Sequence, residues 1–269
     1  MPALEFFTHA PQPPPDTRVW RFRPLKYFRD VIQKREFHFA RADQFPQDDE
    51  EGIPPDEYVA AVRRLDPYAL DRQSTIDNHI GVLAQDREAF FIHCWYRFDE
   101  ERPSVWKDYA FDRDAQEHGV ALCSRYDLLC QAAASFSPRP HVGIVQYGAE
   151  HLKGHYNVQQ FITTKRKQFE SDRELRLGLW HLHPLVGNNR HHDSDNRPHR
   201  RPLFDWIDER RQPCFLRQRV DLQSLLTEII VSPYAPDATR AEVEGLLRDA
   251  GLVIPVRDSE LRRYAVFLP

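Results

Sequence analysis

Two acidic side chains and one arginine, spaced two residues apart, give this sequence its clearest chemical signal. Asp172, Glu174 and Arg176 share one parity, and leucines hold the other parity between positions 175 and 179. With a period of two, residues 172–180 predict a β-strand with a polar row on one face and a largely leucine row on the other. Such a polar row is either a solvent-exposed strand face or a functional site, and the spacing alone leaves both interpretations open.

The overall composition limits the class of protein. The chain has 269 residues, a net charge of −4 and a pI near 6.4. A chain of this length can bury a sizeable core, and its acidic balance argues against a general nucleic-acid coat, although a local basic groove is compatible with it. We expect a flexible proline-rich arm at 1–16, followed by a single domain at 17–269 with a mobile insert at 187–202.

Cysteines and glycines argue against several other classes. The four cysteines are scattered without a Cys-x-x-Cys pair, which favours reduced thiols and a cytoplasmic protein. The first ten residues lack the basic start and apolar run of a signal peptide, and no stretch reaches the ~20 apolar residues that a membrane helix needs, so we expect no membrane partner. None of the ten glycines forms a G-x-G-x-x-G or Walker loop, which argues against a Rossmann or P-loop nucleotide site.

Apolar periodicity predicts many short strands with interspersed helices. Strands are expected at 19–23, 36–40, 89–96, 120–124, 142–147, 172–180, 215–220, 229–231 and 252–256, and helices at 25–33, 55–65, 71–86, 104–110, 127–134, 156–169 and 238–250. Because no Gly-rich crossover marks parallel turns, we expect an α+β fold whose sheet is mixed and largely antiparallel.

A series of loose motifs occurs in a consistent order along the chain. They are an aromatic strand with a following acidic turn (37–41, then 45–52), a Cys-aromatic strand followed by Trp-x-x-Tyr and Gly-Val-Ala (94–95, 106–109, 119–121), a Lys-rich segment before an acid-x-Glu-x-Arg strand (165–167, then 172–176), and Ile-Ile-Val-Ser-Pro before a helix (229–233). In these motifs, over about residues 19–259, the chain resembles the bacterial family catalogued as domain of unknown function 2971. The chain departs from the family at Pro46-Gln47-Asp48, where Asn-Asp-Pro is usual, and at Asp172, where Glu is usual. The resemblance implies an architecture and candidate residues rather than a reaction.

The layout is also similar to that of ADP-ribosyltransferase-like domains. The shared features are a strand–helix–strand opening, a middle aromatic segment and a late strand that carries a glutamate. In such domains a carboxylate contacts the nicotinamide ribose of NAD, where a fixed negative charge stabilises an oxocarbenium-like transition state. The analogy implies an NAD-using enzyme, for example a toxin or phage-defence effector. It implies catalytic roles for Glu174, Tyr109 and Asp172, and cofactor-binding roles for Arg21, Arg23, Arg41, Trp106 and Arg176.

Each of these assignments has a simpler structural alternative. Glu174 and Arg176 would form an ion pair within the sheet, which contributes little stability if it is exposed. Trp106 and Tyr109 have the helical spacing of core residues. A histidine pair at positions 181 and 183 could bind a transition metal with a third ligand, but a flexible histidine-rich loop is the default interpretation and we expect no metal.

A second class of function rests on the arginines between residues 190 and 219. As a non-catalytic module, the chain would bind nucleic acid or a protein partner through Arg200, Arg201, Arg210 and Arg211. Few aromatic side chains lie among these arginines, which weakens the case for nucleic acid. Salt-sensitive binding to a polyanion would distinguish this function from the enzymatic one.

Overall fold

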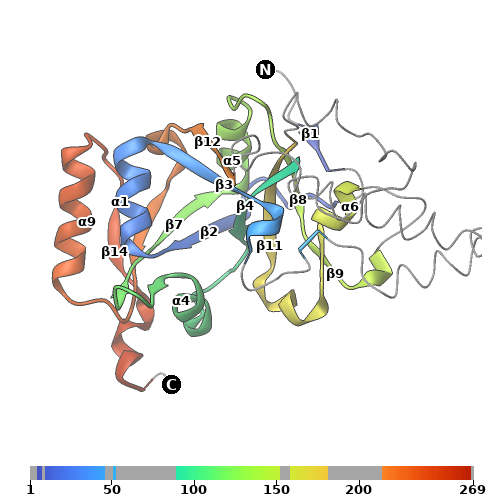
Figure 1. The fold of residues 1–269 in the computed structure, drawn as a ribbon. Coiled ribbons are helices and arrows are strands. Elements are labelled where there is room, and N and C mark those ends of the chain that lie inside the picture. The colour runs from blue at the N-terminus through green and yellow to red at the C-terminus, as the bar shows by residue number, and fades with distance from the viewer. Residues whose placement is uncertain are drawn as a thin grey trace, which may run out of the picture.

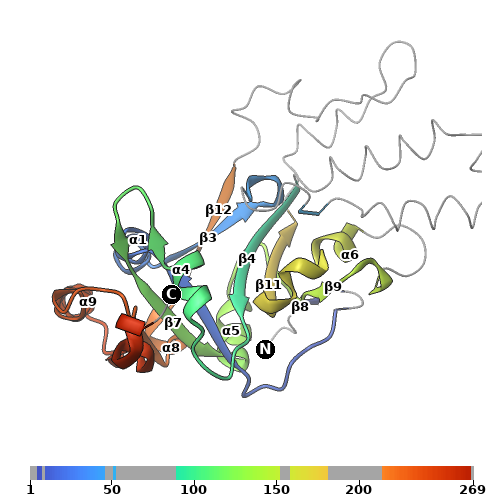
Figure 2. The same cartoon turned by 90° about the horizontal axis from the view of Figure 1, so that it is seen from below.

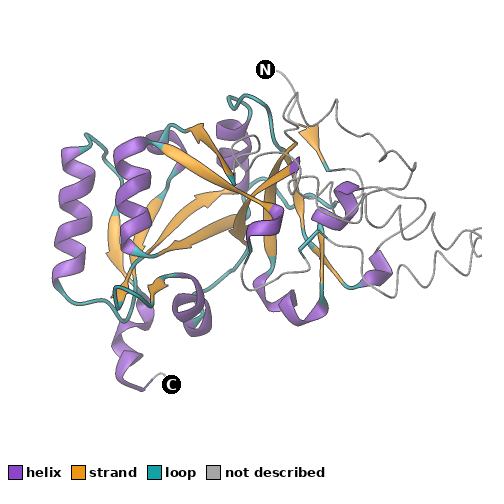
Figure 3. Ribbon diagram, in the orientation of Figure 1, coloured by secondary structure: helices purple, strands orange, loops and turns teal. Residues whose placement is uncertain are grey.

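The computed structural model describes residues 5–7, 10–45, 51–52, 89–151, 158–180 and 214–267 of the chain. The strands are β1 (Glu5–Phe6), β2 (Arg18–Arg23), β3 (Glu36–Arg41), β4 (Phe90–Tyr96), β5 (Phe111–Asp112), β6 (Glu117–His118), β7 (Val120–Arg125), β8 (His141–Ile144), β9 (Gln146–Tyr147), β10 (Thr164–Lys165), β11 (Glu174–Trp180), β12 (Phe215–Arg219), β13 (Glu228–Val231) and β14 (Val256–Asp258). The α-helices are α1 (Leu25–Lys34), α4 (Pro103–Tyr109), α5 (Tyr126–Ala133), α6 (Val158–Ile162), α8 (Leu222–Leu225) and α9 (Ala238–Asp249), and the 3-10 helices are η1 (Ala42–Gln44), η4 (Ala149–His151), η5 (Lys167–Asp172) and η7 (Glu260–Phe267). Figures 1 and 3 show these helices and strands in one arrangement.

Ten of the described strands form one mixed sheet. Its main path runs β1-β8-β11-β4-β2-β7-β13-β14, and β12 pairs with β3, which in turn pairs with β4. Along this path the strand pairs are antiparallel except for β1–β8 and β13–β14, which are parallel. The predicted α+β class, with a mixed and mostly antiparallel sheet of short strands, is therefore confirmed.

The sheet forks at β4. On the edge of β4 opposite β11, β2 pairs only through Trp20 with Tyr96, whereas β3 pairs near the other end, where Ala40 lies opposite Ile92. Between these two contacts, residues 93–95 of β4 have no strand partner on that edge among the described strands. Figure 2 shows β3 and β12 well separated from β7.

Side chains bond the backbone groups that the fork leaves without a strand partner. A guanidinium nitrogen of Arg21 donates to the carbonyl oxygen of Cys94. The Nδ1 atom of His93 lies 3.0 Å from the carbonyl oxygen of His38. Burial and the charge of Arg23 hold the pKa of His93 well below its usual range, so the ring is neutral and its Nδ1–H donates. Buried backbone groups need hydrogen-bond partners, and these two side chains supply them at the fork.

Apolar side chains cover both faces of the sheet. The larger cluster packs α1, α5, α8 and α9 against one face, with Leu175, Leu177 and Leu179 of β11 contributing from the sheet. Figure 1 shows α1 and α9 side by side although they lie far apart in the sequence. The opposite face carries two smaller clusters, one around Trp106 and the other around Ile162. The leucine row predicted for this strand is therefore buried in the main core.

One predicted helix is wrong. Residues 156–169 were expected to form a single helix, but α6 ends at Ile162, and Thr164–Lys165 continue as strand β10 beside β9. The hydroxyl of Thr163 donates to the carbonyl oxygen of Gln159 at 2.8 Å, and three consecutive β-branched residues at 162–164 disfavour further helix. This early end places the Lys165 side chain on the sheet rather than on a helix surface.

The strand predicted at 252–256 is also wrong for most of its length. Residues 252–255 lack a regular ladder, and β14 begins only at Val256. The backbone of Val253 instead bonds the amide side chain of Gln223, and Pro255 has no N–H to donate. The strand predicted at 142–147 is similarly interrupted at Val145, whose N–H donates to the carbonyl oxygen of Glu174.

The amino-terminal segment packs onto the sheet where it is described. Glu5–Phe6 pair in parallel with β8, and Phe7 is 2% exposed. The ring of Phe7 occupies the space over Gly178 of β11, where a Cβ atom would lie 2.4 Å from the ring. Gly178 therefore has a packing role, because only a residue without a side chain leaves room for that ring.

We predict that Gly178→Ala destabilises the fold by ~1–3 kcal/mol, because the added methyl group must displace Phe7. Urea denaturation would measure the change. The matched control is Gly245→Ala in α9, where an added Cβ atom meets nothing nearer than 3.7 Å and removal of a helix glycine is expected to stabilise by ~0.5–1 kcal/mol. Equal stability of the Gly178→Ala variant and the parent would contradict the packing of the arm on β11.

Candidate functional site

The polar row of β11 faces the two smaller apolar clusters. Glu174 and Arg176 are 3% and 0% exposed, and their register partners on β4 are Tyr96 and Cys94. Alternation along the strand sends their side chains to the face opposite the leucines. Of the two interpretations of this row, a solvent-exposed strand face is therefore excluded, and a buried polar cluster takes its place.

Arg176 is the centre of this cluster. Its two terminal nitrogens bind the two carboxylate oxygens of Glu51 at 2.6 and 2.8 Å. Its Nε donates to Glu174 Oε2 at 2.9 Å, and one terminal nitrogen also donates to the carbonyl oxygen of Ile162. A planar guanidinium is suited to such paired bonds, and here it joins three separate parts of the chain.

Lys165 supplies the second positive charge. Its Nζ lies 2.8 Å from Glu174 Oε1, 3.8 Å from Glu51 and 4.0 Å from Asp172. Both oxygens of Glu174 thus have a cationic partner. Among these described side chains, two cations, Arg176 and Lys165, face three carboxylates.

A left-handed residue positions Asp172 beside the strand. The strand was predicted to begin at Asp172, but this residue ends η5 and β11 begins at Glu174. Arg173 between them has φ of 47° and closes the 3-10 helix through its N–H to the carbonyl oxygen of Glu170. The turn at Arg173 brings Asp172 into the cluster although Asp172 is not part of the strand. The hydroxyl of Tyr109 in α4 donates to Asp172 Oδ2 at 3.0 Å.

The two neighbouring carboxylates have opposite pKa shifts. Burial raises the pKa of Glu174, but Arg176 and Lys165 outweigh burial and lower it from 4.5 to about 2. Burial, and then the charge of Glu174, raise the pKa of Asp172, while Lys165 and the hydroxyl of Tyr109 oppose the shift only in part. Glu174 is therefore held in the ionised state, whereas the surroundings of Asp172 raise its affinity for a proton.

The remaining predicted site residues lie apart from this cluster. Arg21 bonds the backbone of β4 at the fork, and Arg41 forms an ion pair with Asp43 at 2.6 Å. The Nε of Arg23 is buried and lacks a hydrogen-bond partner among the described residues. Trp106 is fully buried in the apolar cluster beside α4, so it contacts core side chains. The structure thus brings together Glu174, Asp172, Tyr109 and Arg176, and it does not bring Arg21, Arg23, Arg41 and Trp106 into contact with them.

Sequence reasoning missed four members of the cluster. Glu51 lies in the acidic turn at 45–52, which was not predicted to belong to the site, and Lys165 lies in the segment that was predicted to be a helix at 156–169. Tyr147 accepts a hydrogen bond from the backbone N–H of Glu174 at 2.8 Å, and Cys94 lies opposite Arg176, where burial and the charge of Glu174 raise its pKa to about 12. The Thr-Thr pair before Lys165 is the one local signal that would have placed that lysine on a strand.

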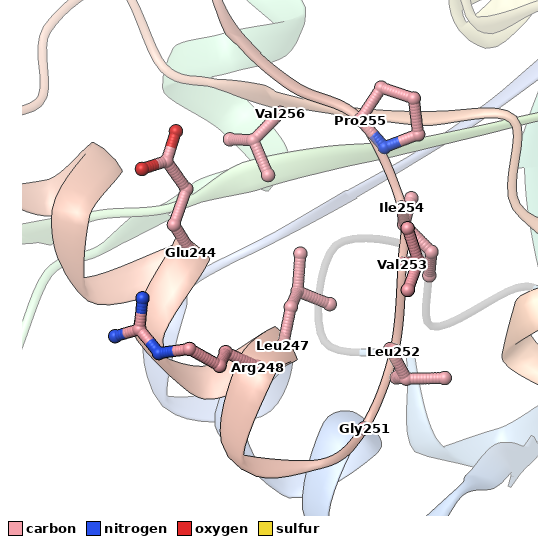
Figure 4. Close-up of a pocket in the computed structure, with 9 residues that line it drawn as sticks. All are labelled: Glu244, Leu247, Arg248, Gly251, Leu252, Val253, Ile254, Pro255 and Val256. Atoms are coloured by element: carbon pink, nitrogen blue, oxygen red, sulfur yellow. The ribbon is translucent and has the colours of Figure 1, made fainter.

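Two pockets among those lined by described residues do not include Glu174 in their lining. The first, with a volume of about 560 Å³, lies between α9 and residues 251–256, and its lining is mostly apolar (Figure 4). The second, of about 500 Å³, is polar and opens near the start of β11, with Tyr147 in its wall. Tyr147 thus lines the second pocket and bonds the backbone of Glu174.

Some predicted residues lie outside the described ranges. These are the insert at 187–202, the two helices at 55–65 and 71–86, the histidines at 181 and 183, and the arginines Arg200, Arg201, Arg210 and Arg211. Within the described residues, no group of three or more His, Cys, Asp or Glu side chains could hold a metal ion, and all four cysteines are free. None of the described helices has the length and apolar character needed to cross a membrane.

Comparison with known proteins gave no match to any protein-family model, curated protein or solved structure. The family resemblance, the ADP-ribosyltransferase analogy and the polyanion-binding alternative therefore stay predictions.

We predict that Arg176→Met destabilises the fold by ~3–5 kcal/mol, because it leaves two buried carboxylates with Lys165 as their only described cationic partner. The control is Arg217→Met, at a half-exposed pair 3.7 Å from Glu36, where a change within ~0.5 kcal/mol is expected. Combining Arg176→Met with Glu51→Gln should cost less than the sum of the single changes. Additive costs in urea denaturation would contradict the Arg176–Glu51 contact.

The lowered pKa of Glu174 predicts a specific acid sensitivity. The folded-state pKa is below the unfolded value, so the ionised group contributes its full stability above about pH 4.5 and loses it as the pH falls towards about 2. Glu174→Gln should therefore be less stable near neutral pH and should lose less stability than the parent across this window. Unfolding free energies measured over a pH series test this, and parallel curves for variant and parent would refute it.

Proposed function

We propose that this protein is an enzyme that cleaves NAD between nicotinamide and ribose and transfers ADP-ribose to an acceptor, with the Tyr109–Asp172–Glu174 cluster as its catalytic centre. The observation that supports this most directly is the pair of adjacent carboxylates with opposite pKa shifts. Environments that push the pKa values of two titratable neighbours apart are a common feature of active sites.

The pairing of Asp172 supports a catalytic rather than a purely structural role. A buried carboxylate without a close cationic partner is costly, and a cluster that served only the fold would be expected to pair each carboxylate closely. Here the nearest described cation to the charge of Asp172 is Lys165, at 4.0 Å, and the hydroxyl of Tyr109 donates one hydrogen bond to this carboxylate. Such a charge is suited to stabilising a cation that forms transiently beside it.

The reaction requires little more than this charge. The bond between C1 of the ribose and the nicotinamide nitrogen breaks, nicotinamide leaves with the bonding electron pair, and the positive charge moves to the ribose. An acceptor hydroxyl or water then adds to C1 and releases a proton. A carboxylate beside the ribose lowers the energy of the cationic state.

Asp172 is the carboxylate of the cluster best placed to contact a substrate. Its side chain is 12% exposed, compared with 4% for Glu174 and 1% for Glu51. In this proposal Asp172 faces the ribose and Tyr109 orients it, whereas Glu174 is a positioning residue that raises the proton affinity of Asp172. A role in toxicity or phage defence stays a prediction that follows from the analogy.

We predict that Asp172→Asn lowers the rate of nicotinamide release from NAD by about 100-fold or more, because it removes the accessible negative charge. The fold should persist, since burial already disfavours this carboxylate. Tyr109→Phe should lower the rate less. Chromatographic detection of nicotinamide and a thermal unfolding curve for each variant provide the two readouts.

The matched control is Asp114→Asn, at an exposed aspartate in the β5–β6 turn, for which an unchanged rate is expected. Absence of nicotinamide release by the parent protein, or an equal rate in Asp172→Asn, would overturn the proposed function.

A further inference from the structure

Three arginines surround the polar pocket near the start of β11. The pocket has a volume of about 500 Å³ and is lined by Arg97, Arg102, Val145, Tyr147, Glu170, Ser171 and Arg173. Glu170 is the only acidic residue of this lining, so the pocket wall carries an excess of two positive charges. A volume in this range accommodates a small organic molecule rather than a lone ion.

The arginines of this pocket have few partners. The Nε of Arg97 is buried and makes no hydrogen bond, and no ion pair of Arg97 is found within the described residues. The nearest carboxylate to Arg173 belongs to Asp99, at 3.8 Å, and that aspartate is fully exposed. Arg102 donates to the carbonyl oxygen of Ser171 at 3.1 Å. Much of the hydrogen-bonding capacity of the three guanidinium groups is therefore still available for a ligand.

Backbone contacts hold the arginines together. The N–H of Arg97 donates to the carbonyl oxygen of Arg173 at 3.1 Å, so the two residues flank adjacent strand ends. The left-handed conformation of Arg173 is fixed by its own N–H bond to Glu170. Arg102 lies over the ring of Phe98, with 4.5 Å between the guanidinium carbon and the ring centre. The backbones of Arg97 and Arg173 and the side chain of Arg102 are thus held near one another, which lowers the entropy cost of bringing the three arginines together on an anion.

Electrostatic crowding in the free pocket favours an anionic ligand. Burial and, to a smaller degree, the charge of Arg173 lower the pKa of Arg97, which means that the environment disfavours the positive charge. A ligand with a negative charge of two would offset the excess charge of the lining. Arginine binds phosphate oxygens through paired, charge-assisted hydrogen bonds.

We propose that this pocket binds the phosphate or diphosphate group of a small molecule through Arg97, Arg102 and Arg173. The inference is independent of the proposed NAD cleavage, because it rests on a different set of side chains and on binding alone. The pocket volume exceeds that of a single phosphate group, so an esterified phosphate or a diphosphate is the expected ligand class.

The test is calorimetric titration of the full-length protein with inorganic pyrophosphate and, separately, with inorganic phosphate. Pyrophosphate should bind, and Arg97→Gln should weaken its binding by about tenfold or more through the loss of charge-assisted hydrogen bonds. Arg97→Gln should unfold at the same or a higher temperature than the parent, because the change removes a half-buried charge that burial disfavours and that has no ion pair among the described residues. A purely structural arginine would give the opposite shift.

Two further variants sharpen the result. Glu170→Gln removes the negative charge of the lining and should strengthen pyrophosphate binding several-fold, whereas Arg113→Gln, at an exposed arginine in the β5–β6 turn, should leave it unchanged. Absence of pyrophosphate binding by the parent, or equal affinity in Arg97→Gln, would overturn the inference. Because binding is measured without NAD, pyrophosphate binding would support the inference even if the protein does not cleave NAD.

Discussion

The buried guanidinium of Arg176 is the interaction on which the described structure most depends. A cation removed from water must be compensated by partners nearby, and Glu51, Glu174 and the carbonyl oxygen of Ile162 supply them. These partners come from the loop after β3, from β11 itself and from the end of α6. The requirement to satisfy one charge therefore brings together three segments of the chain. The position of the cluster between two small apolar clusters on one face of the sheet follows from this requirement.

The fork at β4 divides the sheet into two branches with different packing partners. One branch, β2–β7–β13–β14, packs against α4 on one face and α9 on the other, and the second branch is the β3–β12 pair. At the fork a strand edge would leave backbone groups unpaired, and the side chains of Arg21 and His93 bond there. This explains why Arg21, which was expected to bind the cofactor, bonds the sheet backbone instead. From the sequence alone, a strand arginine that bonds the backbone of the sheet cannot be distinguished from one that binds a ligand.

How far the sequence predicts this protein depends on the range of the interactions involved. Helices α1 and α9 follow from periodicity and strand β4 follows from a nearly continuous apolar run, because these patterns are local. The polar face of Glu174 and Arg176 was predicted for the same reason. The partners Glu51 and Lys165 were not predicted, because only the tertiary fold brings them to the cluster. In the sequence, an acidic turn or a basic segment looks the same whether it is exposed or buried in such a cluster. The helix predicted at 156–169 was wrong because β-branched residues and a threonine hydroxyl end α6 where apolar spacing alone would continue it.

The two candidate sites meet at the start of β11. Asp172 and Glu174 contribute carboxylates to the first, whereas Arg173, the residue between them in sequence, lines a pocket with an excess positive charge. The left-handed conformation of Arg173 separates the cluster from the pocket, because it turns the chain between Asp172 and Glu174. Tyr147 connects them, because its hydroxyl bonds the backbone of Glu174 while its ring lines the pocket. A substrate that develops positive charge on a sugar and carries negative charge on phosphates would match both regions. The same arrangement would disfavour a neutral sugar, for which the arginine pocket offers no counter-charge.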